Sequence, residues 1–232
     1  MYQLPLFPKL DKHNVLIIGD THFPFQHPDY LEFCKDVQKS ERCDTVVHIG
    51  DLVDNHAISY HETDPNSWSP LKEMEKTDLV LEKWFKAFPN LKLTKGSHDC
   101  LVDRKGKTVG LPKRCFKPYR DIWELPDGWE DDFNFEIDDV CYQHGTGNSG
   151  KLAHLNLAIS NRQSTVMGHS HAFAGIAYTA SHKDCIFGMN VGCGIDIKAL
   201  AFAYGKDFKN RPIISCGVVY NGDNPRLFRM KL

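Results

Sequence analysis

The chain has 232 residues, of which 41% are hydrophobic and 25% charged, and its formal net charge at pH 7 is −2. This composition is ordinary for a globular protein with a substantial core, and the near-neutral charge excludes a uniformly basic nucleic-acid-binding protein. No stretch is long and apolar enough for a transmembrane helix, and the first residues lack the pattern of a signal peptide.

Eight cysteines are scattered along the chain without a CxxC pair, which is typical of reduced thiols in a cytoplasm. The sequence contains no repeat, low-complexity segment or linker. We therefore expect one domain, residues 1–232, in the cytoplasm of a bacterial or phage-infected cell and without membrane association. The sequence leaves the oligomeric state open.

The first half of the chain alternates short apolar runs with helical patterns, as in a β-α-β unit. Strands are predicted at 14–19, 45–49 and 91–95, each ending at or just before a glycine, and a helix is predicted at 28–39. A second helix is predicted to begin with Ser69 as its N-cap and Pro70 at its first position. Its side chains form an apolar stripe: Leu71, Met74, Leu81, Trp84, Phe85 and Phe88.

The second half of the chain begins with an irregular stretch, 100–130, in which basic and aromatic residues are interleaved. Beyond it, strands are predicted at 135–137, 140–143, 165–167, 175–179, 186–191, 213–220 and 227–232, and one helix at 151–160. The Asn221-Gly222 pair between the last two strands is a hairpin signal. The pattern predicts an α/β domain with an inserted basic and aromatic region at about 100–130.

Five predicted strand ends carry polar side chains: Asp20 with His22, Asp51, Ser97 with His98, His144, and His169 with His171. Each histidine alone could be structural, but five coincidences at strand ends argue against that interpretation. Imidazole and carboxylate together suit divalent manganese, iron or zinc. The number of groups exceeds one tetrahedral site and fits two ions that share a carboxylate, an arrangement suited to phosphoryl transfer.

These ordered blocks resemble the motifs of the calcineurin-like metallophosphoesterases. The stretch 51–62 further resembles small phage and prophage members of that superfamily. The resemblance implies two facing mixed β sheets flanked by helices, in a four-layer αββα arrangement. It also implies two divalent metal ions, foremost manganese, with iron, zinc, nickel or magnesium as alternatives.

The resemblance also implies a role for each matching residue. Asp51 would bridge the two metals, and the other ligands would be Asp20, His22 and His171 on the first metal and Ser97, His144 and His169 on the second. A hydroxide bridging the metals would be the nucleophile. His98, oriented by Asp99, would donate a proton to the leaving oxygen or stabilise its charge. Asp54 would contact the metal ligands without binding a metal itself.

Position 97 departs from the family pattern, which has asparagine there. Serine reaches less far and offers a neutral hydroxyl, which is a poorer ligand. Three explanations compete: a weak second metal site, a water that replaces the missing arm, or a deliberate substitution that slows turnover. The otherwise intact set of ligands favours the last of these.

The leading hypothesis is a phosphodiesterase for a nucleotide or nucleic-acid substrate. The residues expected to bind substrate are His56, His61, Lys113 and Arg114, because cations pair with phosphate and aromatic neighbours can stack on bases. The alternatives are a phosphomonoesterase for a nucleotide or a phosphoprotein, and a catalytically weak binding protein on the same fold. A separate cysteine chemistry at Cys141 or Cys193 has little support, since neither has an activating neighbour in sequence.

Overall fold

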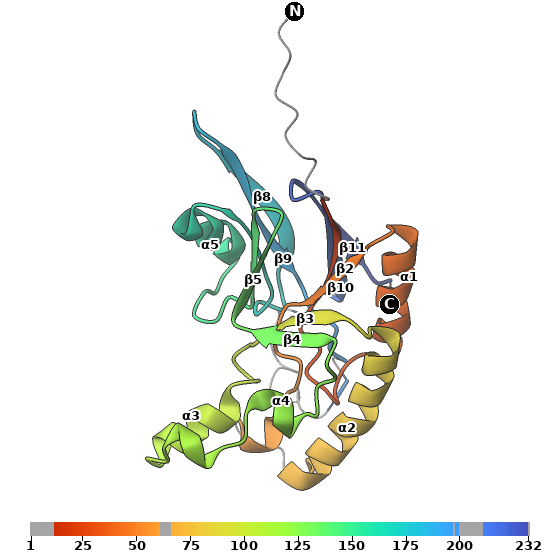
Figure 1. Ribbon diagram of the computed structural model, residues 1–232, viewed down its shortest axis with the longest axis vertical. Helices are drawn as coiled ribbons and strands as arrows, with labels where there is room; N and C mark the ends of the chain where they lie inside the picture. Colours follow the sequence, from red (N-terminus) through yellow and green to blue (C-terminus); the bar gives the residue numbers. More distant parts are fainter. Residues whose placement is uncertain (1–11, 61–65, 197, 200–210, 232) are drawn as a thin grey trace, which may run out of the picture.

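The computed structural model describes residues 12–60, 66–196, 198–199 and 211–231, and they form two β sheets that face each other (Figure 1). The six-stranded sheet has the order β11-β10-β1-β2-β3-β4 and the five-stranded sheet the order β5-β6-β7-β9-β8. The strands of the first sheet are β1 (Asn14–Ile18), β2 (Thr45–His48), β3 (Leu91–Thr94), β4 (Trp129–Asp132), β10 (Ser215–Tyr220) and β11 (Asn224–Arg229). Those of the second are β5 (Asn134–Ile137), β6 (Val140–Gln143), β7 (Ser164–Met167), β8 (Ala174–Ala180) and β9 (Cys185–Val191).

Both sheets are mixed. In the first sheet β1, β2, β3 and β4 are parallel, and β10 and β11 continue the sheet antiparallel. In the second sheet β6, β7 and β9 are parallel, and the two outer strands are antiparallel to their neighbours. The carboxyl ends of β1, β2 and β3 therefore lie at one edge of their sheet, and those of β6 and β7 at one edge of the other.

The alternation of side chains along β1 divides the core into two layers. Leu16 and Ile18 belong to the cluster packed under α1 (Tyr30–Ser40) and α2 (Pro70–Ala87), together with Trp84. Val15 and Ile17 belong to the layer between the sheets. On the far face, α5 (Ala153–Asn161) packs its apolar residues against β7. The order helix, sheet, sheet, helix confirms the predicted fold class (Figure 1).

The start of α2 was placed correctly, and its apolar stripe was correct except at one end. Ser69 Oγ accepts a hydrogen bond from Lys72 N at 3.3 Å, as an N-cap does. Leu71, in contrast, is 68% exposed, because the contacts of α2 with the buried core begin only at Met74. Among the helices within the described residues, none combines the length and the apolar composition that crossing a membrane requires.

The stretch 100–130 is not irregular, which corrects the sequence-based prediction. It contains α3 (Leu101–Thr108), the short 3-10 helix η2 (Lys113–Cys115) and α4 (Tyr119–Ile122), and β4 begins at its end. Helix α3 is fixed by tertiary contact, since Gly106 leaves room for the ring of Phe116. Strand β4 has no apolar alternation; it is held by pairing with β3 and by Trp129 Nε1, which donates to Phe88 O at 2.7 Å.

Candidate metal centre

The polar strand ends predicted from the sequence meet where the two sheets face each other. Asp20, Asp51 and Ser97 follow β1, β2 and β3 of the first sheet. His144 follows β6 and His169 follows β7 of the second. Because neighbouring parallel strands end at the same edge, residues far apart in the chain converge on one small region.

Three groups of candidate ligand atoms lie in this region, and the atoms of each group are all within 4.8 Å of one another. One consists of His22, Asp54 and His98. The other two contain Asp51, the first with Asp20, His22 and His171, and the second with His144 and His169. Asp51 belongs to both of these groups, so a single carboxylate lies where two neighbouring cations could share it. The two sets coincide with those that the sequence motifs predict, apart from Ser97.

Two of the four candidate histidine rings in the groups that contain Asp51 are oriented by a hydrogen bond on one nitrogen, which leaves the other nitrogen for a metal. His22 Nδ1 donates to Asp54 Oδ1 at 2.6 Å, and His144 Nδ1 donates to the carbonyl of Ile49 at 3.0 Å. Their Nε2 atoms point into the site, 3.2 Å from His171 Nε2 and 3.1 Å from Asp51 Oδ2 respectively. A partner on the second nitrogen is the usual way in which proteins fix a metal-binding histidine.

The site has a polar atom that a cation would satisfy. Asp20 Oδ1 is buried and forms no hydrogen bond within the part of the chain that the structure describes. Two glycines allow the backbone to approach the carboxylates closely, since a Cβ at Gly96 would collide with Asp51 and one at Gly168 with Asp20. The donor set and its geometry are therefore compatible with divalent metal binding.

Three of the candidate ligands have an uncommon backbone conformation. His22, Asp51 and His169 have φ angles of 50°, 46° and 65°, in the left-handed region that residues other than glycine seldom adopt. Such conformations cost about 1–3 kcal/mol each and persist where the surrounding structure enforces them, commonly at functional sites. Three strained candidate ligands in one cluster support a functional interpretation.

The buried charges of the site stabilise one another. Burial would raise the pKa of Asp51, but the imidazole of His144 and its neighbours hold that pKa well below its ordinary value. For His144 the effects are reversed: burial lowers its pKa, and the carboxylates of Asp51 and Asp20 raise it to about 9. The carboxylates and the imidazole therefore favour each other's charged forms.

His98 lies beside the ligands and is arranged to hold a proton. Its Nδ1 donates to the carbonyl of Asp54 at 2.6 Å, and its backbone N–H donates to Asp51 Oδ1 at 2.7 Å. Burial lowers the pKa of His98, but the Asp51 and Asp54 carboxylates outweigh it and raise the pKa to about 10. The side chain is 24% exposed, whereas that of Asp54 is 3% exposed. An imidazolium that reaches solvent can act as a proton donor.

Asp54, and not Asp99, orients His98, through its backbone carbonyl at 2.6 Å and its carboxylate at 3.3 Å from Nδ1, which corrects the sequence-based prediction. Asp99 accepts hydrogen bonds from Gly96 N at 2.8 Å, Leu52 N at 3.1 Å and Tyr119 Oη at 2.7 Å. It thus holds the loop after β2 against the loop after β3. Adjacent residues of a loop can face opposite sides, so sequence neighbourhood with His98 was a poor guide. No sequence signal identified Tyr119 as the partner of Asp99.

The residues predicted to bind substrate divide into three cases. His56 is 4% exposed and its ring packs edge-on against Phe25. The prediction that its side chain binds substrate near the metals is therefore wrong. Its backbone N–H is fixed by Glu73 Oε1 at 2.7 Å, which turns it into the core. His61 lies outside the described residues. Lys113 and Arg114 are exposed on η2.

Ser97 lies close to the second ligand group. Its Oγ is 3.4 Å from Asp51 Oδ2, so the hydroxyl points at the shared carboxylate.

The alternative cysteine chemistry finds no support. Cys141 and Cys193 are both buried, and burial raises the pKa of each thiol, so neither is poised as a thiolate.

Removing divalent cations is expected to lower the Tm of the protein by about 5–10 °C, relative to protein holding a cation at about 100 times its Kd. A cation that binds only the folded state stabilises it, and the buried carboxylates of Asp20 and Asp51 lose their counter-charge without it. Calorimetry with added manganese and with excess chelator measures the shift. Asp20→Asn should reduce the shift, whereas the exposed control Asp36→Asn should not. Equal Tm values in both conditions would contradict the metal centre.

Fold and site together define an α/β protein with a carboxylate- and histidine-rich centre between two sheets. The family model described as calcineurin-like phosphoesterase matches residues 13–185, and the chain belongs to this family. Membership supports hydrolysis of phosphoric esters as the general activity. A comparison with curated proteins gave no match.

Solved structures with a similar arrangement of the chain were also found. Nuclease MPE from Pseudomonas putida is 12% identical, with a TM-score of 0.46 and alignment over 93% of this chain and 87% of that one. The phosphoesterase Yfce from E. coli is 14% identical, with a TM-score of 0.41 and coverage of 90% and 88%. Vacuolar Protein Sorting 29 from Cryptosporidium parvum is 11% identical, with a TM-score of 0.43 and coverage of 95% and 98%.

Proposed function

We propose that the chain is a phosphodiesterase that uses two divalent cations, foremost manganese, held by the two ligand groups that share Asp51. The observation that carries this proposal is the shared carboxylate itself, because two groups with one common ligand suit a pair of adjacent ions. When bound, such cations lower the pKa of water and polarise a phosphoryl oxygen.

The residues of the chain supply the other parts of the reaction. Asp20, His22 and His171 would hold one cation, and His144 and His169 the other, with Ser97 beside them. His98 would deliver its proton to the leaving oxygen, since the Asp51 and Asp54 carboxylates favour its protonated form and its side chain is partly exposed. Asp54 would orient both histidines, accepting a hydrogen bond from His22 Nδ1 through its carboxylate and one from His98 Nδ1 through its backbone carbonyl.

A cationic and aromatic surface next to Ser97 favours a diester with an extended substituent. Arg104 Nη1 donates to Ser97 O at 3.4 Å. The ring of Tyr60, which is 52% exposed, has Lys105 Nζ at 3.9 Å from its centroid and Arg104 Cζ at 5.1 Å. Cations around an exposed ring suit a nucleotide or nucleic acid, where phosphate and base lie close together. Neither Tyr60 nor Arg104 was among the residues that the sequence predicted to bind substrate.

The test is initial rate on an aryl phosphodiester compared with the matching aryl phosphomonoester, with and without manganese. A higher kcat/KM on the diester, lost with chelator, is the expected result. Preference for the monoester would favour a phosphomonoesterase. No turnover of either, with retained metal and ligand binding, would favour a binding protein, for which the serine at position 97 is the supporting observation.

Replacing Lys113 and Arg114 together with alanine is expected to weaken binding of a single-stranded oligonucleotide. It should also reduce the slope of log affinity against log salt by about 1.4, since each lost phosphate contact removes roughly 0.7. Hydrolysis of a small aryl diester should be nearly unchanged. Fluorescence anisotropy at several salt concentrations measures the slope.

The matched control for that experiment is Lys151→Ala with Lys183→Ala, two exposed lysines, one just before α5 and one on the turn between β8 and β9. These substitutions remove the same charge from parts of the chain that are remote from η2 in sequence. An equal reduction of the slope in both double variants would show that only total charge matters. Equal losses on the oligonucleotide and the aryl diester would indicate a structural role for η2.

A further inference from the structure

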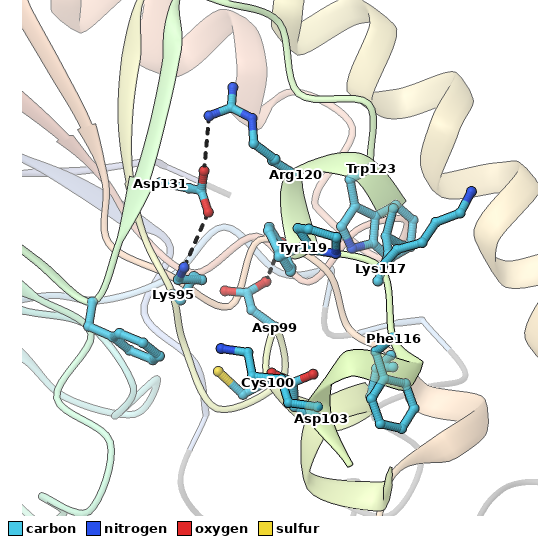
Figure 2. A pocket seen from close by; sticks show the side chains of 15 residues that line it. Lys95, Asp99, Cys100, Asp103, Phe116, Lys117, Tyr119, Arg120, Trp123 and Asp131 are labelled. Atoms are coloured by element: carbon cyan, nitrogen blue, oxygen red, sulfur yellow. Dashed lines mark hydrogen bonds and ion pairs between the residues drawn. The ribbon is translucent and has the colours of Figure 1, made fainter. Parts of the chain in front are cut away.

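A cavity of about 310 Å³ is lined by side chains of the loop 95–100 and of the elements around it (Figure 2). Ser97 Oγ and His98 N, on that loop, face Asp51. The side chains of Asp99 and Cys100, on the same loop, line the cavity, together with residues of α3, η2, α4 and β4. The loop thus carries both side chains that line the cavity and groups that contact the shared carboxylate of the candidate metal centre.

The lining of the cavity combines aromatic rings with an excess of positive charge. Its rings come from Phe116, Tyr119, Trp123 and Phe133, and Phe133 is 59% exposed. Its charged groups are four cations, Lys95, Lys113, Lys117 and Arg120, and three carboxylates, Asp99, Asp103 and Asp131.

The charges of the lining are not all engaged within the protein. Asp131 is shared between Lys95 Nζ at 3.2 Å and Arg120 Nη1 at 3.4 Å, as the dashed lines in Figure 2 show. Lys113 and Lys117, in contrast, form no salt bridge with any residue that the structure describes. Such a surface suits a ligand with a flat ring and a negative charge. The volume lies at the small end of the range for ligand pockets, so the ligand is of nucleotide size.

A chain of hydrogen bonds leads from the cavity to the loops that carry the candidate metal ligands Asp51 and Ser97. Tyr119, on the cavity wall, donates to Asp99 Oδ1 at 2.7 Å. Asp99 in turn accepts from Gly96 N at 2.8 Å and from Leu52 N at 3.1 Å. Gly96 precedes Ser97 and Leu52 follows Asp51, so the Asp99 carboxylate fixes the backbone on both sides of the shared ligand. A ligand packed on the Tyr119 ring would hold this connection in place.

We propose that this cavity binds a small aromatic anion of nucleotide size, and that Tyr119 and Asp99 couple its occupancy to the affinity of the metal centre. The binding half of the proposal is independent of the proposed function, whereas the coupling half rests on it. The two halves are therefore tested by separate measurements.

The binding half is tested by calorimetric titration of adenosine 5′-monophosphate into the full chain with manganese present. One site is expected, with adenosine alone and inorganic phosphate alone each binding at least tenfold more weakly. Lys117→Ala with Phe133→Ala should weaken binding at least tenfold. The matched control, Lys183→Ala with Tyr178→Ala, also removes one exposed lysine and one exposed ring, and should not.

Two results would overturn the binding half. One is the absence of binding by wild type. The other is binding that survives Lys117→Ala with Phe133→Ala but is lost in Asp51→Asn, which would place the nucleotide at the metal centre. Retained nucleotide binding in Asp51→Asn, together with its loss in the cavity variant, supports the proposal.

The coupling half is tested by measuring manganese affinity with and without saturating nucleotide. We expect at least a fivefold increase in affinity, and the same factor in nucleotide affinity when manganese is added, since coupling is reciprocal. Tyr119→Phe keeps the ring and removes the hydroxyl, so it should retain nucleotide binding and lose the coupling. If wild type binds manganese with the same affinity with and without nucleotide, the coupling is overturned. If wild type does not bind manganese at all, the proposed function is overturned instead.

Discussion

Asp51→Asn is expected to abolish metal-dependent hydrolysis and to lower the occupancy of both metal positions. The carboxylate lies in two of the ligand groups, and the environment keeps it ionised. The amide has the same shape but lacks the charge that two cations would share, so the loss is electrostatic and not steric. Rate and metal content per chain of the purified variant measure the effect.

The control for Asp51→Asn is the exposed Asp36→Asn, which makes the same chemical change on α1. It should retain full rate and metal content. Two full equivalents of metal in Asp51→Asn would contradict the bridging role. One equivalent would show that Asp51 serves a single cation.

Ser97→Asn is expected to raise kcat by at least tenfold, which corresponds to about 1.4 kcal/mol of activation free energy. The serine hydroxyl lies 3.4 Å from Asp51 Oδ2 and has a shorter reach than an asparagine oxygen would have. A longer arm would hold the second cation directly and orient it better than an exchangeable water. The measurement is initial rate at saturating manganese, together with titration of the second equivalent of metal.

Ser97→Ala separates the explanations for this serine. If the hydroxyl is only a bystander, alanine should leave rate and metal affinity unchanged while asparagine raises both. If the hydroxyl is a working ligand, alanine should lower both, and asparagine should bring no gain. The second pattern would show that this chain binds its metal through serine.

The sequence identified the candidate metal ligands because the pattern that marks them spans only a few neighbouring residues. A buried apolar strand, a turn and a polar residue are read within a few positions, and Asp20, Asp51 and His144 all follow this pattern. Parallel pairing then brings the strand ends together without further information. The hairpin at Asn221-Gly222 was likewise predictable, because asparagine and glycine tolerate the positive φ angles that both residues have in the structure.

The errors arose where the path of the chain in space decides the outcome. Asp99 does not pair with His98, because its carboxylate accepts hydrogen bonds from Gly96 N and Tyr119 Oη. His56 is buried because Glu73, from α2, fixes its backbone. Helix α3 depends on a contact between Gly106 and Phe116. None of these contacts leaves a periodic pattern or a motif in the sequence.

The division of the ligands between the two sheets has a mechanical consequence. Asp20, His22 and Asp51 lie in loops that follow strands of one sheet, and His144, His169 and His171 in loops that follow strands of the other. Neither sheet alone supplies either of the two groups that contain Asp51, so cation affinity depends on the sheets being docked. Any motion that separates the sheets at this edge would release the ions, and bound ions would oppose that motion. If the site binds cations, their affinity would therefore report how firmly the two halves of the sandwich are held together.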